Sequence, residues 1–241
     1  MNFEKVARLL TEAPPPKDSL VVLPEMFATG FSMNSAIAET YGGETEQFLG
    51  RTAKQFGVFL LAGAAMRGRD GSARNKALVF SPEGELVALY AKMRPFTTGG
   101  ETQHYVAGEH PVVFKWADCT VSPFICYDLR FPEIFREVVA AHRPEVFAVI
   151  ANFPEKRIQH WVTLLQARAI ENQAYVVGVN RIGTDPYYSY GGRSLIISPQ
   201  GDSIADAGMR EGSIHATLDL DGLRQYRQGL PFLEDVGTWS R

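Results

Sequence analysis

The sequence predicts a mixed α/β fold in which layered β-sheets lie between helices. Strand-length apolar runs alternate with segments of helical periodicity, and two strand pairs are joined by polar turns that contain Pro and Gly. Several strands are apolar on both faces, so helices have to cover the sheets. The 241 residues suffice for one large core, and we expect residues 1–241 to form a single domain.

The first quarter of the chain is expected to form helix, strand, helix and strand. The first helix covers residues 3–13, because Pro14 and the two prolines after it cannot continue a helix. A buried strand over 20–23 delivers Pro24 and Glu25 at its end. A second helix over 44–56 leads into a strand over 58–66.

Two hairpins and a run of alternating strands and helices are expected in the rest of the chain. Residues 76–92 form two strands joined at SPEGE, and Lys92 ends the second strand. Residues 194–207 repeat this strand, SPxG turn and strand pattern, which suggests two sheet halves built alike. Between the hairpins we expect a strand ending at Cys126, a helix over 131–143, a strand over 146–152, a helix around 160–174 and a strand over 175–183.

Composition and charge favour a small-molecule partner. The formal net charge is -3 and there is no extended Lys/Arg run, which argues against nucleic acid or an anionic membrane surface as a partner. Apolar runs are far shorter than the roughly 20 residues of a membrane-spanning helix, and MNFEKVARLL does not resemble a secretory signal, so a cytoplasmic protein is expected. Cys119 and Cys126 lie too far apart along one strand to form a disulfide, so both are expected to be free thiols.

Cys126 is a candidate nucleophile because it ends an apolar strand just before a helix. Open α/β sheets bind ligands at the carboxyl ends of their strands, and a thiolate is a strong nucleophile once the thiol has lost its proton. The backbone N–H of Tyr127 would then point at a developing oxyanion. The alternative is that Cys126 is a small core residue, the commoner role of a buried Cys.

Glu25 and Lys92 end two other strands. Burial at a strand end would raise the pKa of Glu25 toward neutrality, which suits a carboxylate that takes and returns a proton. The alternatives are a solvent-facing Glu25 and an edge-strand Lys92. Three such residues on three strand ends nevertheless form the arrangement by which α/β sheets assemble a site.

The strings around these residues, LPEMFATGF, YAKMRPF and ICYDLRFPEIFR, resemble the three active-site blocks of the nitrilase, or carbon-nitrogen hydrolase, superfamily. The similarity continues through residues 151–183 and 190–202 and covers nearly the whole chain. It implies a four-layer α-β-β-α sandwich of mixed sheets and a homodimer. Chains of this superfamily begin with a β-strand ahead of the first helix, and that strand is apparently absent here.

The resemblance implies roles for four residues. Glu25 is the general base, Lys92 stabilises the oxyanion, Cys126 is the nucleophile, and Glu101 in GGETQHYVAG orients Lys92 and the substrate. No cofactor is expected, and no metal site either, because Cys and His lack the spacing of zinc ligands.

Within the superfamily, the blocks CYDLRFP, NFP, HW, LLQARAIENQAYV and NRIG most resemble the omega-amidase branch. This implies release of ammonia from a 2-oxo dicarboxylic acid monoamide, such as 2-oxoglutaramate or 2-oxosuccinamate, through a Cys thioester. Arg130 or Arg157 would bind the free carboxylate, and Phe153 would wall the pocket. Surface arginines and a core phenylalanine are the alternatives.

Two other functions remain open at the level of the sequence. One is hydrolysis of another small amide in the same superfamily, such as deaminated glutathione or an N-carbamoyl amino acid. The other is a catalytically silent interaction module with a nitrilase-like fold, against which the intact Glu25, Lys92 and Cys126 argue.

Overall fold

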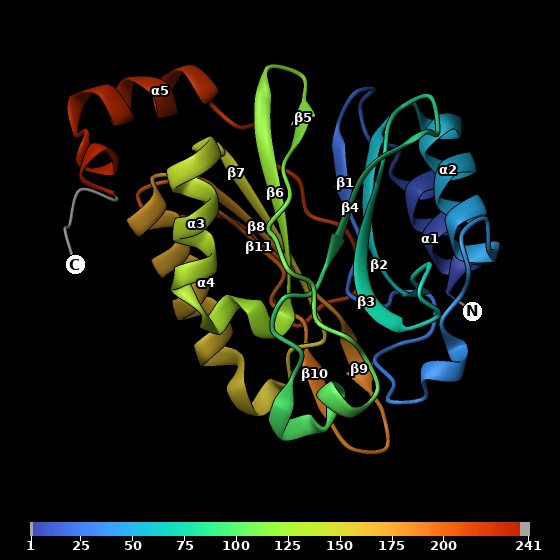
Figure 1. Cartoon of the computed structure of the whole chain (residues 1–241). Coiled ribbons are helices and arrows are strands. Elements are labelled where there is room, and N and C mark those ends of the chain that lie inside the picture. Colours follow the sequence, from blue (N-terminus) through green and yellow to red (C-terminus); the bar gives the residue numbers. More distant parts are fainter. Residues whose placement is uncertain (1, 237–241) are drawn as a thin grey trace.

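Two β-sheets stacked face to face form the centre of the molecule, and helices cover both outer faces (Figure 1). The computed structural model describes residues 2–236. Helices α1 (Phe3–Glu12) and α2 (Glu44–Phe56) lie over the first sheet, and α3 (Pro132–His142) and α4 (Ile158–Asn172) lie over the second. The predicted four-layer α-β-β-α sandwich is therefore confirmed.

The first sheet has four strands in the order β1-β2-β3-β4. Strand β1 runs parallel to β2, and the remaining pairs are antiparallel. The predicted hairpin at SPEGE is present as the β3–β4 connection. The strands are β1 (Leu20–Val22), β2 (Phe59–Arg67), β3 (Ala73–Phe80) and β4 (Leu86–Ala91).

The second sheet has six strands in the order β12-β11-β8-β7-β6-β5. Its three central strands β6, β7 and β8 are parallel, and the outer strands pair antiparallel. A separate small hairpin consists of β9 and β10. The strands are β5 (Phe114–Trp116), β6 (Cys119–Ile125), β7 (Val146–Ala151), β8 (Tyr175–Asn180), β9 (Ile182–Thr184), β10 (Ser189–Gly191), β11 (Leu195–Ile197) and β12 (Ser203–Asp206).

Two predicted strands end differently from expectation. The strand expected over 175–183 is interrupted, because β8 ends at Asn180 and Ile182 begins the separate β9–β10 hairpin. The amide of Asn180 donates to the carbonyls of Phe153 and Gly192, which ties the break to two neighbouring loops. The strand expected to end at Cys126 ends at Ile125 instead, and Cys126 opens a 3-10 turn.

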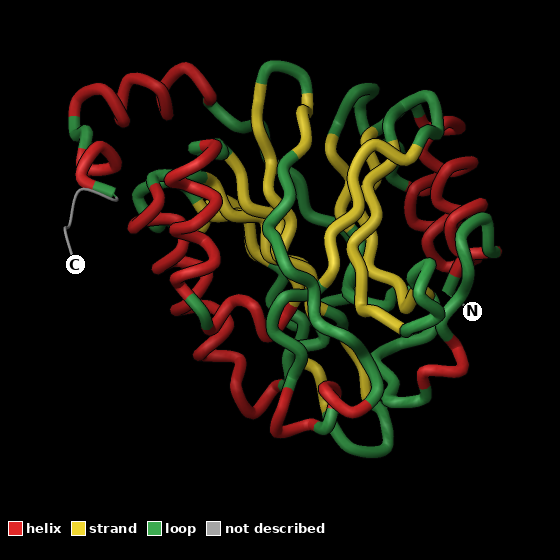
Figure 2. Tube along the Cα trace, viewed as in Figure 1, coloured by secondary structure: helices red, strands yellow, loops and turns green. Residues whose placement is uncertain are grey.

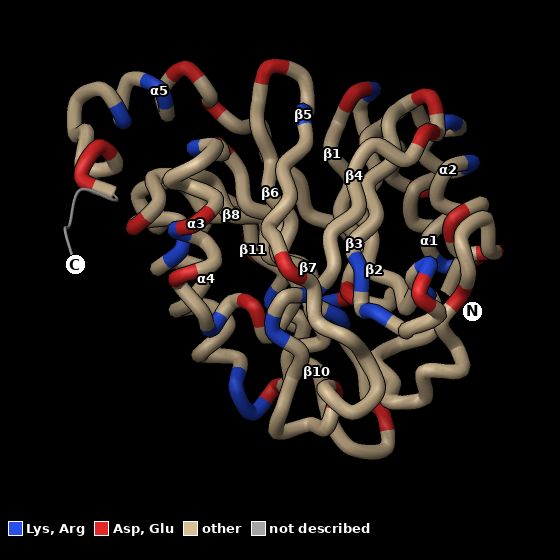
Figure 3. Tube along the Cα trace, in the orientation of Figure 1, with Lys and Arg blue, Asp and Glu red and all other residues tan. Residues whose placement is uncertain are grey.

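The core fills the space between the sheets and beneath the helices. Every residue of β6 and β7 is buried, as expected for central parallel strands. Loops gather at one end of the sandwich, at the bottom in Figure 2, where the β9–β10 hairpin also lies. Charged residues lie mostly on outer helices and turns, with a further group toward this lower end (Figure 3). Within residues 2–236, no helix is long and apolar enough to cross a membrane.

Candidate active site

Glu25, Lys92 and Glu101 meet between the two sheets and are almost fully buried. Glu25 follows β1, Lys92 follows β4, and Glu101 lies in a 3-10 turn, Glu101–Gln103. The Lys92 ammonium donates to Glu25 Oε1 at 2.9 Å and to Glu101 Oε2 at 2.8 Å. The structure therefore brings together three of the four predicted catalytic residues as one hydrogen-bonded group.

Cys126 is the fourth predicted catalytic residue, and its thiol interacts electrostatically with Glu25, Lys92 and Glu101. Burial raises the pKa of its thiol well above the ordinary range, and the negative charge of Glu25 raises it further. The Lys92 ammonium and the backbone N–H of Asn152 partly offset these effects. The resting Cys126 is therefore a thiol and not a thiolate at neutral pH.

The pKa of Glu25 differs from the prediction. Burial alone would raise it, but the Lys92 charge and hydrogen bonds from Asn152, Lys92 and Asn75 lower it below the ordinary value. The expectation that its pKa rises toward neutrality is therefore wrong, because that expectation counted burial without the Lys92 charge and these three hydrogen-bonding residues. Burial would likewise lower the pKa of Lys92, yet Glu25 and Glu101 hold it above its usual value.

The resting group thus holds two carboxylates, one ammonium and one neutral thiol. Glu25 Oε1 accepts from Lys92 and from Asn75, while Oε2 accepts from the backbone N–H of Asn152 at 2.8 Å and from its side-chain amide at 3.1 Å. Because that amide also donates to the Glu25 carbonyl, the weaker bond to Oε2 is the easiest to exchange. Oε2 is therefore the oxygen best able to accept a new proton.

Cys126 sits on a strained turn that the neighbouring Asp128 stabilises. The backbone φ of Cys126 is 49°, a left-handed conformation that is uncommon for a residue other than glycine. Asp128 Oδ2 accepts from the N–H of Ile125 and from the Tyr90 hydroxyl, and Oδ1 accepts from the N–H of Arg94. Asp128 therefore connects the turn that carries Cys126 to the chain that leaves β4.

Burial raises the pKa of Asp128 to about 6, although three hydrogen bonds favour its ionised form. At neutral pH the carboxylate is ionised and can accept all three bonds. Below about pH 6 a proton competes with these donors at the same two oxygens.

A second strained turn carries Glu25. Met26 has a φ of 44°, and Gly63 of β2 lies directly against this turn. A Cβ added to Gly63 would lie 2.5 Å from the Cα of Glu25 and 2.6 Å from the N of Met26. The Phe27 N–H also donates to the Gly63 carbonyl at 3.1 Å. The position of Glu25 therefore requires glycine at residue 63.

A narrow pocket opens above the catalytic group and contains the predicted substrate-binding residues. Its free volume is about 30 Å³. Tyr127, Arg130, Phe153 and Arg157 all line it, together with Glu25, Lys92 and Cys126. Glu101 lies behind Lys92 and is not part of the lining.

The two arginines of the pocket are held by aromatic rings. Arg157 lies 5.7 Å from the ring of Phe96 and 6.0 Å from the ring of Tyr188, and Arg130 lies 5.3 Å from the ring of Phe153. Among residues 2–236, neither arginine forms an ion pair with a carboxylate within 4.0 Å. Arg130 instead lies 3.4 Å from Nδ1 of His160. The pocket mouth therefore presents positive charge to a ligand.

Sequence reasoning missed several residues of the site. Asn75 and Asn152 contact Glu25, and Asp128 supports the Cys126 turn. A signal existed for Asn152, which directly follows an apolar strand, but not for Asn75, which lies in a polar stretch between Arg74 and Lys76. The remaining lining residues were not singled out from the sequence. Tyr190 belongs to β10, and the others lie in loops or turns: Phe31, Phe96, Pro154 and Tyr188.

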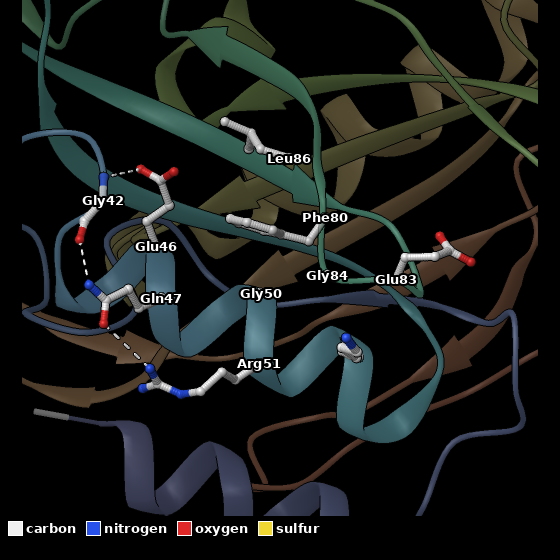
Figure 4. Close-up of a pocket in the computed structure, with 10 residues that line it drawn as sticks. Gly42, Glu46, Gln47, Gly50, Arg51, Phe80, Glu83, Gly84 and Leu86 are labelled. Atoms are coloured by element: carbon white, nitrogen blue, oxygen red, sulfur yellow. Dashed lines mark hydrogen bonds between the residues drawn. The ribbon is translucent and has the colours of Figure 1, made fainter.

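A broader hollow lies elsewhere, on the outside of the first sheet between α2 and the β3–β4 turn (Figure 4). Its polar groups bond to one another: Gly42 N–H donates to Glu46, Gln47 donates to the Gly42 carbonyl, and Arg51 donates to Gln47. We therefore assign no chemistry to this surface.

Both cysteines, Cys119 and Cys126, are free, as predicted.

The family model of the carbon-nitrogen hydrolases matches residues 1–228. The chain belongs to the carbon-nitrogen hydrolase family. Its relatives include the omega-amidase YafV of Escherichia coli K12, which is 37% identical over 219 residues, or 90% of this chain and 84% of the relative. The 2-oxoglutaramate amidase of Bacillus subtilis is 32% identical over 234 residues, 96% of this chain and 90% of the relative.

A solved structure supports the same assignment. XC1258 from Xanthomonas campestris, a carbon-nitrogen hydrolase superfamily protein with an arsenic adduct in its active site, superposes with a TM-score of 0.91. It is 32% identical, and the alignment covers 100% of this chain and 92% of XC1258. This carbon-nitrogen hydrolase is therefore an amidohydrolase that acts on C–N bonds.

Proposed function

We propose that this carbon-nitrogen hydrolase removes ammonia from the terminal carboxamide of a small 2-oxo dicarboxylic acid monoamide, through a thioester on Cys126. The observation that carries the proposal is the buried group of Glu25, Lys92 and Glu101 beside the Cys126 thiol, in a pocket lined by Arg130 and Arg157, neither of which is ion-paired to a carboxylate of residues 2–236. The group supplies the chemistry, and the arginines supply a reason for an acidic substrate.

The first step forms a tetrahedral intermediate. Glu25 takes the Cys126 proton as the sulfur attacks the amide carbon, and the carbonyl oxygen gains negative charge. Because the thiol pKa is raised and the Glu25 pKa is lowered, this transfer is unfavourable before the substrate binds. Proton transfer and attack are therefore coupled, with the developing oxyanion providing the driving force.

Lys92 and Tyr127 stabilise that oxyanion. An ammonium has three N–H donors, and two of those on Lys92 already go to Glu25 and Glu101, so the third is available. The Tyr127 N–H lies in the first turn of a short helix, where backbone donors lack partners within the helix. Both donors are fixed before the reaction begins.

The second half of the reaction releases the products. Protonated Glu25 gives its proton to the amide nitrogen, and the C–N bond of the tetrahedral intermediate breaks. Ammonia departs, and the acyl group remains on Cys126 as a thioester. Glu25 then takes a proton from water as the hydroxide attacks the thioester carbon. The C–S bond breaks, the acid departs, and the proton returns to the Cys126 sulfur.

The pocket favours an acyl chain that carries a carboxylate. A guanidinium binds a carboxylate through two parallel hydrogen bonds, and Arg157 is the better placed arginine because two rings orient it while Arg130 also faces His160. Phe153 is buried and forms part of the wall.

A second candidate is an amidase for deaminated glutathione, because the chain is 33% identical over 249 residues to a protein of that name from Synechocystis, across 97% of this chain and 91% of the relative. Ammonia release decides between the two. The panel consists of 2-oxoglutaramate, 2-oxosuccinamate, deaminated glutathione and an N-carbamoyl amino acid, with Cys126→Ala as the blank. We expect the highest kcat/KM on a 2-oxo monoamide; a preference for deaminated glutathione would reject the proposed substrate.

An Arg157→Met variant tests the carboxylate contact, since methionine keeps much of the apolar stem but removes the charge. We expect KM for the acidic monoamide to rise at least about tenfold, the equivalent of one charge-assisted contact. Turnover of an uncharged amide of similar length should change little. An equal loss on both substrates would contradict the role.

A further inference from the structure

Asn75 contacts three members of the catalytic group, although its side-chain amide takes no part in the proposed bond-making or proton-transfer steps. It belongs to β3 and is almost fully buried. Its backbone carbonyl accepts from the Lys92 N–H at 2.9 Å. The residue therefore holds the backbone of Lys92 and turns its own side chain toward the carboxylates.

The side chain of Asn75 closes a ring of hydrogen bonds. Its Nδ2 donates to Glu25 Oε1 at 2.7 Å and to Glu101 Oε1 at 2.9 Å. On the other side, Lys92 donates to the same Glu25 oxygen and to Glu101 Oε2. Two carboxylates are thus joined by one ammonium and one amide, and the two N–H groups of that amide are both used.

The orientation of this amide is fixed by charge. Its carbonyl oxygen Oδ1 is buried and has no hydrogen-bond partner among residues 2–236. A flipped amide would turn this oxygen toward two carboxylates, so the unpartnered Oδ1 is the cost of keeping both donors on them. Such a buried, unsatisfied atom is rare and points to a functional constraint at this position.

The charge of the group explains what the amide does. Glu25, Glu101 and Lys92 together carry one net negative charge in a buried place, because two carboxylates face one ammonium. The titratable groups that face Glu25 are Lys92, Glu101 and Cys126, with the hydroxyls of Tyr105 and Tyr190 further out. Without the hydrogen bond from Asn75, the Glu25 carboxylate would bind a proton more readily.

We propose that Asn75 is a positioning residue that holds the side chains of Glu25 and Glu101 on either side of Lys92. Glu25 is then ready to take the Cys126 proton, and the third N–H of Lys92 stays directed at the oxyanion. The inference rests on the proposed chemistry of Cys126, but not on which amide the enzyme hydrolyses.

The variant Asn75→Leu tests this role, because leucine has a similar size and removes both donors together with the unpartnered acceptor. Asn172→Leu is a matched control: Asn172 is also buried, also has an unpartnered Oδ1, and donates to the Arg168 carbonyl in α4, outside the pocket. Asn75→Thr keeps a single hydroxyl donor on a residue that suits a strand.

The first measurement is the rate of Cys126 alkylation by iodoacetate, which has no carboxamide group, as a function of pH. The reaction needs the thiol proton to leave but needs no amide substrate. Loss of the Asn75 bonds lets the Glu25 pKa rise. The acid limb, that is, the low-pH part of the profile in which the alkylation rate increases with pH, should therefore move to higher pH. A shift of one unit corresponds to about a tenfold lower rate on that limb.

We expect Asn75→Leu to shift the limb most, Asn75→Thr to shift it less, and Asn172→Leu to match the wild type. If Asn75→Leu does not fold, the Thr variant alone must show the upward shift. An unchanged limb in a folded Asn75 variant, or an equal shift in Asn172→Leu, would overturn the inference.

The second measurement is kcat/KM for the best amide of the substrate panel over the same pH range. The same order of acid limbs is expected, with kcat falling more than KM changes. If no 2-oxo monoamide is hydrolysed, the proposed substrate fails while the alkylation profile still tests Asn75.

Discussion

At the scale of single residues, two buried lysines differ in their hydrogen-bond partners, and only one of them belongs to the site. Lys92 and Lys76 lie near each other on neighbouring strands and are both buried. Lys92 bonds two carboxylates, whereas Lys76 bonds only the hydroxyl of Tyr41 at 3.0 Å among the described residues. Only Lys92 therefore combines a buried charge with acidic partners and a place in the pocket.

Lys92→Ala should lower kcat at least about 100-fold, because one oxyanion donor is typically worth that much. The measurement is steady-state ammonia release on the preferred amide. Lys76→Ala serves as the control and should retain near-normal turnover while losing some thermal stability. Near-normal turnover in Lys92→Ala would reject its role at the oxyanion.

Residue identity could be predicted better than residue environment. The sequence blocks indicate Glu25, Lys92 and Cys126, and the structure brings them to one pocket. The direction of the Glu25 pKa shift could not be predicted, because it depends on donors from Asn75 and Asn152, which lie 50 and 127 positions away in the sequence. Long-range hydrogen bonds of this kind leave no local pattern.

At the scale of secondary-structure elements, two tight turns present the reactive groups. Glu25 follows β1 on one sheet and Cys126 follows β6 on the other, and each turn includes a residue with positive φ. Strand periodicity predicts where such strands run but not the left-handed residue after them. This is why the strand expected to include Cys126 ends one residue earlier.

Gly63→Ala tests the turn that carries Glu25. The new Cβ would collide with backbone atoms of Glu25 and Met26, so we expect a loss of stability of about 1–3 kcal/mol from overpacking. A displacement of Glu25 by about 1 Å should also lower kcat by roughly 100-fold. Chemical denaturation and steady-state kinetics measure the two effects.

Gly178→Ala is the matched control for this change. Gly178 is a buried-strand glycine of β8, and its added Cβ would collide with the side chains of Leu165 and Trp161 under α4. We expect a comparable loss of stability with turnover close to that of the wild type. If Gly63→Ala also kept normal turnover, Glu25 would not depend on the close approach of β2.

At the scale of the whole molecule, the alternation of strands and helices predicts layered sheets covered by helices, and the resemblance to the superfamily predicts the four-layer sandwich. The order of strands within each sheet could not be read from the sequence, because it depends on pairings such as β8 with β11 across a separate hairpin. Helix α5 (Leu220–Gly229) was also not predicted. It is held by long-range contacts of Arg227 with the carbonyls of Gln173 and Arg143, which have no local signature.

We also expect this carbon-nitrogen hydrolase to form a homodimer. Several large apolar side chains remain exposed on the chain alone, among them Ile170 of α4, Leu230 and Met209. Burial of any of these side chains between two copies would be favourable, but the expectation itself comes from the resemblance to the superfamily. Light scattering at micromolar concentration should give twice the mass of one chain; a monomer at that concentration would contradict the expectation.

The central claim is that Cys126 carries the acyl group of an amide substrate. Intact-mass spectrometry after rapid mixing with 2-oxoglutaramate and acid quenching tests it most directly. The wild type should gain the mass of the acyl group, with the adduct on the Cys126 peptide, and Cys126→Ala should gain none. An adduct retained in Cys126→Ala, or equal ammonia release by both proteins, would contradict the account.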